Sequence, residues 1–388
     1  MSDIKRAKIV LKELKKNGYE GYIVGGAVRD HLLRMPLTDI DITTNAKPHE
    51  VSKIFKKTKP TGIKYGTVSV YIGEDIFEVT TYRLENGYKD HRHPSDVNFS
   101  DSVLDDVSRR DFTINGLLMD ETGLVTDLVG GQSDLNAKMI RTIGDPKDRF
   151  NEDALRMLRA FYFQAKLGFQ IDAETRLAIS THKDDLLKIS SERVMTELIK
   201  TFKGPYLKRA VQSIVSTGVH EVLPGLKKGF EYINQLDEMP FVDAFFTLSF
   251  ALNKGVDPYW PFSNKHRHKY EMASQLANQY QRFDPMTLYT YGIDLCLLAN
   301  KVNTILNRTK NQRSKIEKDF SELPVKSELD LVLKPFEMMK MTGKKPGAWL
   351  KEVQQAMVVD ILNKKLKNNK EDLKTYVLNY LKNQGEPQ

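Results

Sequence analysis

The stretch "GGAVRDHLLRMPLTDIDITT", residues 25–44, decides the fold of the first third of this chain. The preceding "GYIV" (21–24) is typical of a short strand, two glycines follow, and "GAVRDHLL" has the spacing of a helix. "DIDIT" (39–43) then alternates with period two, as a strand with one buried face does. Because alternate residues of a strand point to the same side, we expect Asp39 and Asp41 to hold their carboxylates side by side.

Two adjacent carboxylates repel each other unless cations lie between them. Mg²⁺ commonly takes one or two protein carboxylates together with substrate phosphates, and paired metal ions support phosphoryl transfer. Gly25 and Gly26 would leave backbone N–H groups open to phosphate oxygens at the start of a helix, with Arg29 one turn further on. The stretch therefore predicts nucleotidyl transfer from a nucleoside triphosphate onto a hydroxyl, with Mg²⁺ as the cofactor.

The rest of the first 145 residues also mixes strand and helix patterns. "TVSVYI" (67–72) and "IFEVTTY" (76–82), joined through residues 73–75, predict a hairpin. Alternation places Glu78 on the face opposite Phe77 and Val79, which makes Glu78 a candidate third catalytic carboxylate. From about Phe150 the strand patterns disappear and amphipathic helical stretches follow one another. The expected fold is a small mixed α/β head on a predominantly α-helical body.

Length and composition are those of an ordinary globular protein of two or three domains. Apolar residues make up 40% and charged residues 28% of the 388 residues. No apolar run is long enough to span a membrane and the N-terminus lacks a cleavable signal, so a cytoplasmic protein without a membrane partner is expected. The single cysteine, Cys296, rules out an internal disulfide framework and a Cys-rich zinc site and predicts a buried thiol.

The net charge of +8 is concentrated at the end of the chain. Residues 301–388 contain eighteen Lys and Arg against eleven Asp and Glu. Such a surface favours a polyanionic partner, although a solvated helical surface explains the charge equally well. We therefore expect four regions: a mixed α/β head (1–145), a helical region (146–203), a helical body (204–300) and a basic helical tail (301–388).

Several motifs in this order resemble the DNA polymerase beta-like nucleotidyltransferases, in the form of the bacterial class II tRNA nucleotidyltransferases. The resemblance begins with "GGAVRD...DIDI" and covers about half of the chain. The further motifs are "YRLENGYKDHRHPSDVNF" (82–99), "RRDFTINGLL" (109–118), "RFNEDALRMLRA" (149–160), "SSERVMTEL" (190–198) and "TGKKPGAWL" (342–350). In this family the first four correspond to a flexible loop, a ribose-reading segment, a nucleobase-reading helix and the helix start that braces it. The resemblance implies that residues 1–145 are the catalytic head, residues 146–203 the nucleobase-recognition neck and residues 301–388 the tRNA-binding tail.

The base-reading motif also has a physical interpretation of its own. Asp153 and Arg156 are three residues apart on the expected helix, so both would face the same way. A carboxylate accepts from an exocyclic amine and a guanidinium donates to an acceptor beside it, a pattern that C and A share and that U and G reverse. The resemblance implies that these two residues select both bases without a template. The alternative is a surface i,i+3 ion pair.

The ribose-reading motif and the helix after the base-reading pair receive their roles from the resemblance. It implies that Arg110 faces the nucleotide, that Asp111 faces the ribose hydroxyls with Asn115 in support, and that Arg159 is a further nucleotide contact. An N-cap role for Asp111 stays open beside this. Tyr162 departs from the family, which commonly has another arginine there.

The resemblance implies an elongated enzyme that adds C, C and A from CTP and ATP to a tRNA acceptor end. Lys344 and Lys345 would track the RNA backbone, and Trp349 would either stack on a base or fill a helix core. The "HRH" triplets at 91–93 and 266–268 fit no metal pattern and are expected at the surface or toward RNA. The oligomeric state, a homodimer included, stays open.

Three alternatives remain. A poly(A) polymerase shares the head, but "GIKYGTVSVYI" (62–72) has the form of the tRNA enzymes rather than the more basic segment of the polymerases. An enzyme that adds only C or only A is opposed by the complete loop from Arg83 to Pro94. A noncatalytic RNA-binding protein is opposed by the intact pair of Asp39 and Asp41.

Overall fold

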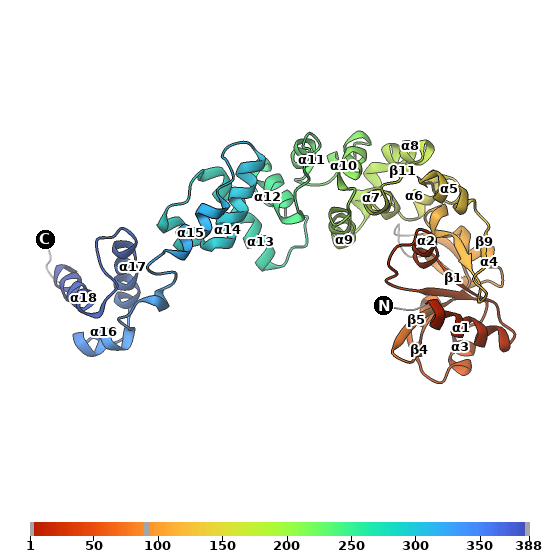
Figure 1. Cartoon of the computed structure of the whole chain (residues 1–388), viewed down its shortest axis with the longest axis horizontal. Coiled ribbons are helices and arrows are strands. Elements are labelled where there is room, and N and C mark those ends of the chain that lie inside the picture. The colour runs from red at the N-terminus through yellow and green to blue at the C-terminus, as the bar shows by residue number, and fades with distance from the viewer. Residues whose placement is uncertain (1–3, 89–93, 385–388) are drawn as a thin grey trace. The chain divides into compact units, whose positions relative to one another are not determined.

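The structure, a computed structural model, describes residues 4–88 and 94–384 and divides into two compact units (Figure 1). Unit 1 comprises Met1–Met239 with Tyr259–Pro261, and unit 2 comprises Pro240–Pro258 with Phe262–Gln388. The expected boundary at residue 300 falls inside helix α14 (Pro285–Ile305). The division into four regions otherwise stays a prediction.

Unit 1 begins with a seven-stranded mixed sheet in the order β3-β4-β5-β2-β1-β8-β9. The strands are β1 (Gly21–Val24), β2 (Asp41–Thr44), β3 (Thr58–Gly62), β4 (Thr67–Ile72), β5 (Asp75–Thr81), β8 (Leu117–Met119) and β9 (Val125–Asp127). Strand β2 pairs antiparallel with β1 and parallel with β5. The predicted hairpin is confirmed as β4 and β5, with Ile72 opposite Asp75 across a two-residue turn.

The helices of the head bury the apolar stripes that the sequence predicts. Helix α1 (Ile4–Lys16) packs against β1 through Ala7, Val10, Leu11 and Leu14, each at most 1% exposed. Figure 1 shows α1 beside α3 (Pro48–Ile54), which contacts β4 and β5. Helix α2 (Gly26–Leu32) contacts β1 and β8, and α4 (Val103–Ser108) and α5 (Gly131–Ala137) complete the head.

Two strand pairs lie outside the main sheet. β6 (Arg83–Tyr88) and β7 (Pro94–Phe99) form an antiparallel hairpin, and the "HRH" triplet at 91–93 lies outside the described residues. β10 (Met139–Ile140) pairs with β11 (Gln170–Ile171). The expectation that strands end near Phe150 is therefore wrong for β11, whose two residues are too short to give a strand pattern.

Helices make up the rest of unit 1. They are α6 (Pro146–Glu152), α7 (Leu155–Leu167), α8 (Ala173–His182), α9 (Ser191–Phe202), α10 (Leu207–Ser216) and α11 (Lys227–Ile233). Helix α7 is the centre of this layer, with ten of its thirteen residues buried and with α9 and α10 packed against it. Asp145 caps α6 by accepting from the backbone N–H groups of Lys147 and Asp148.

Unit 2 contains helices alone within its described residues. They are α12 (Val242–Asn253), α13 (Asn264–Gln279), α14, α15 (Arg313–Ser321), α16 (Pro335–Thr342), α17 (Ala348–Leu362) and α18 (Lys370–Gln384), with a short 3₁₀ turn at Glu328–Asp330. Gly292, with φ 75° and ψ 166°, interrupts the helical backbone inside α14. Cys296 is fully buried, as predicted, and burial raises the pKa of its thiol to about 12.

None of the helices formed by residues 4–88 and 94–384 combines the length and apolar character that crossing a bilayer requires.

Candidate active site

A pocket of about 430 Å³ in unit 1 brings together most of the predicted site residues. It is lined by the β1–α2 turn, the start of β2, the segment around Arg110 and Asp111, and helices α7 and α9. The lining residues predicted from the sequence are Gly25, Gly26, Arg29, Asp39, Asp41, Arg110, Asp111, Asn115, Asp153, Arg156 and Arg159. Their proximity is a tertiary result, since they span more than a hundred positions of the chain.

The glycine turn lies at one wall of this pocket. Gly25 has φ 73° and ψ −136°, a backbone conformation that residues with a side chain rarely adopt. A Cβ on Gly25 would lie 3.2 Å from Nη1 of Arg110, and a Cβ on Gly26 would lie 3.4 Å from Nη2 of Arg29. The absence of side chains thus keeps the backbone open beside two guanidinium groups.

The carboxylates of Asp39 and Asp41 lie at the next wall. β2 begins at Asp41, so the prediction that Asp39 also belongs to the strand is wrong; Asp39 lies two residues before it in an irregular segment. The alternation nevertheless holds, because Asp39 and Asp41 are exposed while Ile40 and Ile42 are buried. The two acidic side chains share the open face.

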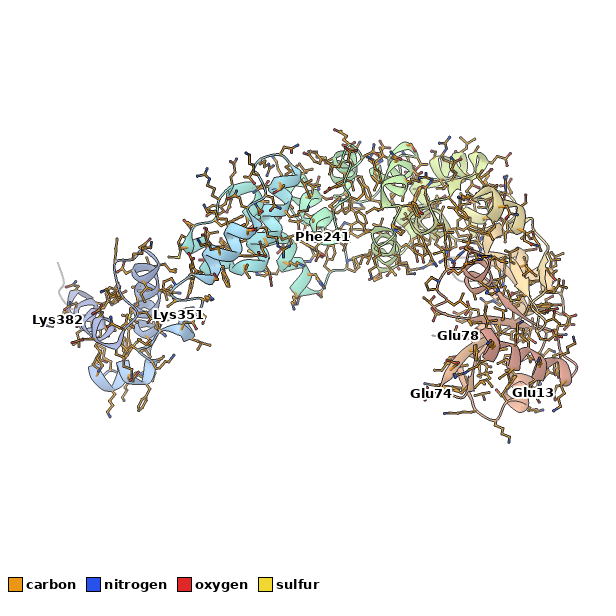
Figure 2. All side chains as sticks on the ribbon, viewed as in Figure 1. Glu13, Glu74, Glu78, Phe241, Lys351 and Lys382 are labelled. Carbon is orange, nitrogen blue, oxygen red and sulfur yellow. The ribbon has the colours of Figure 1, made fainter. Side chains whose placement is uncertain are left out.

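Glu78 joins this pair from the neighbouring strand. The parallel register of β2 and β5 places Asp41 opposite Glu78, and Phe77 and Val79 are fully buried on the other face, as predicted. Figure 2 labels Glu78 on β5 and Glu74 at the turn of the same hairpin. Glu78 is a neighbour of Asp41 and is not itself part of the pocket wall.

Asp41 lies in a field that favours a cation. The surrounding protein desolvates its carboxyl group and raises its pKa; Arg110 opposes this effect, and the charges of Glu78 and Asp39 add to it. In the described part of the chain no three potential ligand side chains already form a metal cage. A hard divalent cation fits this donor set, because two or three carboxylates would leave its other positions to phosphate oxygens and water.

Arg110 is held in place from behind by a buried carboxylate. Asp106 is fully buried in α4 and accepts from Nη2 of Arg110 at 3.0 Å, from Nε of Arg109 at 2.9 Å and from Oγ1 of Thr43 at 3.0 Å. Burial alone would raise the pKa of Asp106, but the two arginines outweigh it and hold the pKa below its usual value. The Nε–H of Arg110 is buried and has no acceptor among the described residues, so the guanidinium has one unsatisfied hydrogen-bond donor.

Asp111 forms the centre of a second network. Its Oδ1 accepts from Asn115 Nδ2 at 2.9 Å and from the Phe112 N–H at 2.8 Å, while Arg159 donates to Oδ2 through Nη2 at 2.6 Å. Burial would raise the pKa of Asp111, yet Arg159 and Asn115 hold it below its usual value. The alternative of an N-cap is wrong, because Phe112 occupies the cap position of the 3₁₀ turn Thr113–Asn115.

Arg29 is also part of this second network. It is 3% exposed, donates through Nη1 to Asn115 Oδ1 at 2.5 Å and through Nη2 to Asp30 at 2.7 Å, and lies over the ring of Phe163. Arg29 therefore positions Asn115, which in turn orients Asp111.

The prediction that Asp153 and Arg156 share one helix is wrong. α6 ends at Glu152, Asp153 has an extended backbone (φ −144°, ψ 101°), and α7 begins at Leu155. The two side chains still reach the same pocket, because the Arg156 N–H donates to the Asp153 carbonyl at 3.0 Å across the break. Nor do they form the alternative i,i+3 ion pair.

Each of these two side chains has another partner. Asp153 Oδ2 accepts from Nη2 of Arg193 at 2.8 Å, so the start of α9 braces Asp153. Arg156 donates to Glu152 Oε2 at 2.8 Å and to the Arg109 carbonyl at 2.7 Å. Both are held rigidly, as side chains that recognise a flat ligand need to be.

Sequence reasoning missed Lys166 and Lys200, which also line this pocket. Lys166 donates to Asp30 at 2.8 Å, and Lys200 donates to Glu197 at 2.9 Å and lies 5.9 Å from the ring centroid of Tyr162. Helical spacing gave no signal for them, because each resembles an ordinary solvated lysine on an amphipathic helix.

The basic tail segment is open to solvent. Lys344 and Lys345 are exposed beyond the end of α16, next to Gly343 with φ 67°. Trp349 is only half-buried and donates to the Lys345 carbonyl at 2.9 Å, so a full core position is wrong.

Comparison with known proteins finds three family models that match successive parts of the chain. Residues 21–141 match the poly A polymerase head domain, residues 168–230 a probable RNA and SrmB-binding site of polymerase A, and residues 258–377 a putative tRNA nucleotidyltransferase domain 2. The CCA-adding enzyme of Bacillus cytotoxicus is 36% identical over 97% of this chain and 98% of its own length. That of Oceanobacillus iheyensis is 37% identical over 96% of each chain.

Solved structures give the same correspondence. A Bacillus stearothermophilus CCA-adding enzyme in complex with CTP superposes with a TM-score of 0.84 at 30% identity and covers 99% of both chains. A Thermotoga maritima CCA-adding enzyme complexed with tRNA shares the fold, with a TM-score of 0.65 at 18% identity over 96% of this chain and 94% of that one.

Proposed function

We infer, because this chain belongs to the family of CCA-adding enzymes, that it adds C, C and A from CTP and ATP to the 3′ end of tRNA by two-metal nucleotidyl transfer. The observation that supports the mechanism is that the carboxylates of Asp39, Asp41 and Glu78 lie together beside the glycine turn and Arg110. In this reaction the terminal hydroxyl oxygen bonds to the α-phosphorus, the α–β phosphoanhydride bond breaks, and pyrophosphate leaves.

Asp39 and Asp41 are the residues that would hold Mg²⁺, with Glu78 as the adjacent third carboxylate. When bound, Mg²⁺ supplies activation of the attacking hydroxyl and neutralisation of the phosphate charge. The protein contributes Asp39 and Asp41 at the pocket wall, and the pairing of β2 with β5 places Glu78 beside Asp41. Arg110 and the open backbone at Gly25 and Gly26 then favour the triphosphate on the adjoining wall.

Base selection is assigned to other residues that line the same pocket. Asp153 would accept from the exocyclic amine of C or A, and Arg156 would donate to the neighbouring ring acceptor. Asp111 would accept from the ribose hydroxyls, and Arg159 would orient Asp111 and contact the nucleotide. Because Arg193 and Glu152 hold the base-reading side chains, a base that presents the reversed pattern would set acceptor against acceptor and donor against donor.

Tyr162 stands where the family commonly has an arginine, and a lysine from helix α9 compensates for the missing cation. Lys200 of α9 lies over the Tyr162 ring and supplies a cation near the position where the family commonly has an arginine. We assign Lys200 to an electrostatic contact with the nucleotide or the RNA terminus. Unlike an arginine, it acts as a point charge and gives no bidentate hydrogen bond.

The acceptor RNA is assigned to the basic tail. Lys344 and Lys345 would contact phosphates, and the lysines of residues 364–370 would extend the same kind of surface. A tRNA acceptor end is the RNA partner that the family implies.

One experiment tests the activity and separates it from its alternatives. The protein is incubated with Mg²⁺ and a tRNA that lacks its last three nucleotides, with CTP alone, ATP alone, or both, and the 3′ end of the product is sequenced. We expect two C residues with CTP alone and the complete CCA with both. Runs of A would identify a poly(A) polymerase, a product that stops at CC or receives only A would identify a partial enzyme, and no extension would contradict the assignment.

A further inference from the structure

A second pocket, of about 1010 Å³, lies in unit 2. It is formed by the start of α12, helix α13, the middle of α14 and the beginning of α15. All of its lining residues belong to unit 2, whereas all of those of the active-site pocket belong to unit 1. The second pocket is therefore a separate site.

The floor of this second pocket is apolar and partly aromatic. Leu295 and Leu298 of α14 line it together with Phe241, Tyr291 and Phe320. Phe241, labelled in Figure 2, is 53% exposed at the N-terminus of α12. Phe241 is exposed and Tyr291 and Phe320 are half-buried, and aromatic rings beside apolar side chains favour a ligand with a flat ring that can stack.

The rim of the second pocket carries an excess of positive charge. Four cations, Lys265, Lys269, Lys301 and Arg313, face two carboxylates, Asp243 and Asp294. Asp243 is already paired with Lys269 at 2.6 Å, and Arg313 donates to Glu317 at 2.8 Å. Lys265 and Lys301 have no ion-pair partner in the described part of the chain, so two cations are left for an anionic group.

A buried donor at the second pocket also lacks an acceptor. Asn300 is 2% exposed and lines the pocket, and its Oδ1 accepts from the Gln312 N–H at 3.1 Å. Its Nδ2 is buried and has no hydrogen-bond partner among residues 4–88 and 94–384. Buried polar groups are normally satisfied, so this amide indicates a missing acceptor. The interruption at Gly292 adds the start of a second helical run, whose N-terminal end favours negative charge, at the same wall.

We propose that this second pocket binds a nucleotide outside the active site. The base lies on the aromatic floor, the phosphate lies between Lys265 and Lys301, and the Asn300 amide donates to an oxygen or nitrogen of the ligand. Charge complementarity and the aromatic floor together favour a nucleotide over a purely apolar occupant. The same chemistry could come from a free nucleotide or from one nucleotide of an RNA strand, and the test distinguishes these two sources.

Photocrosslinking with 5-iodouridine reports the position of the base directly. The full-length protein is irradiated with 5-iodouridine 5′-monophosphate or with a single-stranded RNA that carries one 5-iodouridine, and the residue that carries each adduct assigns it to one of the two pockets. We expect adducts on Phe241, Tyr291 or Phe320 by peptide mass spectrometry. Adducts with the mononucleotide indicate a free nucleotide, and adducts with the RNA alone indicate an RNA nucleotide.

Two charge variants should change the adduct yield in opposite directions. Lys301→Glu should lower the adduct yield about tenfold, and Asp294→Asn should raise it about two- to threefold, because they remove and add favourable charge at the rim. Lys382→Glu makes the same charge change on α18, outside this pocket, and should leave the yield unchanged. Absence of adducts on all three aromatic residues with both probes, or equal yields from Lys301→Glu and Lys382→Glu, would overturn the proposal. The activity of the enzyme on tRNA lacking its last three nucleotides is a separate readout, so failure of one assignment is distinguishable from failure of the other.

Discussion

Two sets of carboxylates serve the active-site pocket, and the fold treats them in opposite ways. Asp39 and Asp41, just before and at the start of β2, lie beside a third acid, and the pKa of Asp41 is raised. Asp106 and Asp111 are buried against arginines, and their pKa values are lowered. The first set keeps negative charge that a ligand can neutralise, whereas the charge of the second is already used to position other side chains. The difference separates a site for chemistry from the frame that holds it.

The largest effect is expected from removing the charge of Asp41 at the start of β2. Asp41→Asn should lower the rate of CTP and ATP incorporation by about 10³-fold or more, because the carboxylate that would hold the metal is lost. Glu74→Gln, in the turn of the same hairpin, is the matched control and should retain full activity. Measured turnover of Asp41→Asn near that of the control would contradict the metal assignment.

The thermal stability of Asp41→Asn also distinguishes the two sets of carboxylates. Because the pKa of Asp41 is raised in the folded protein, its ionised form opposes folding at neutral pH, so Asp41→Asn without Mg²⁺ should melt at a slightly higher temperature.

Removing a carboxylate from the frame should instead damage the fold. Asp106→Ala leaves Arg109 and Arg110 without their buried partner, and breaking such a pair costs about 3–5 kcal/mol. Urea denaturation of the purified protein measures this loss. A midpoint equal to that of the wild type would show that Asp106 does not hold the arginines.

Freeing a base-reading side chain should change selectivity more than rate. Arg193→Ala releases Asp153 from its brace, and we expect the preference for CTP over UTP to fall about tenfold. Lys203→Ala, an exposed change at the end of the same helix, is the control. The ratio of kcat/KM values for the two triphosphates is the measurement, and an unchanged ratio would argue against Asp153 as a base reader.

The pH dependence of stability sharpens the comparison further. Since the pKa of Asp111 is lowered by folding, its stabilising contribution is complete above the ordinary Asp pKa of about 4 and is lost as the pH falls through the lower folded value. The difference in Tm between the wild type and Asp111→Asn should therefore be constant from about pH 6 to 8 and shrink below about pH 4. A difference that grows on acidification would reverse the assignment.

The smallest effect concerns cations that the fold leaves unpaired. Lys344 and Lys345 are exposed, unlike the arginines of the pocket, and replacing both with alanine should reduce the slope of log K against log salt for tRNA binding by about 1–2. An unchanged slope would mean that this segment is only a solvated surface. Turnover at saturating tRNA should change little.

The sequence predicted those parts of the site whose signals are local. Alternation and a short turn were enough for the hairpin of β4 and β5, for the burial of Phe77 and Val79, and for the open face shared by Asp39 and Asp41. The resemblance then assigned distant motifs to one site, and eleven of the residues predicted for it line the pocket. The roles of those residues stay predictions.

The misses have a common physical cause, which is that tertiary contacts decided them. The break at Asp153 has no proline or glycine to mark it, and the i,i+3 spacing reads as one helix. Asp106 lies in "VLDDVS", where an acidic residue looks like a solvated helix charge, and its burial depends on Arg109, Arg110 and Thr43. Gly292 similarly interrupts α14 where the surrounding sequence looks helical.

The parallel pairing of β2 with β5 has a consequence for the order in which this enzyme matures. Asp41 and Glu78 become neighbours only after the intervening α3, β3 and β4 have been made and the later strand has docked. During synthesis, a chain that has emerged only as far as β4 already contains Asp39 and Asp41 but lacks Glu78. A site that uses all three carboxylates therefore cannot form before β5 has paired with β2.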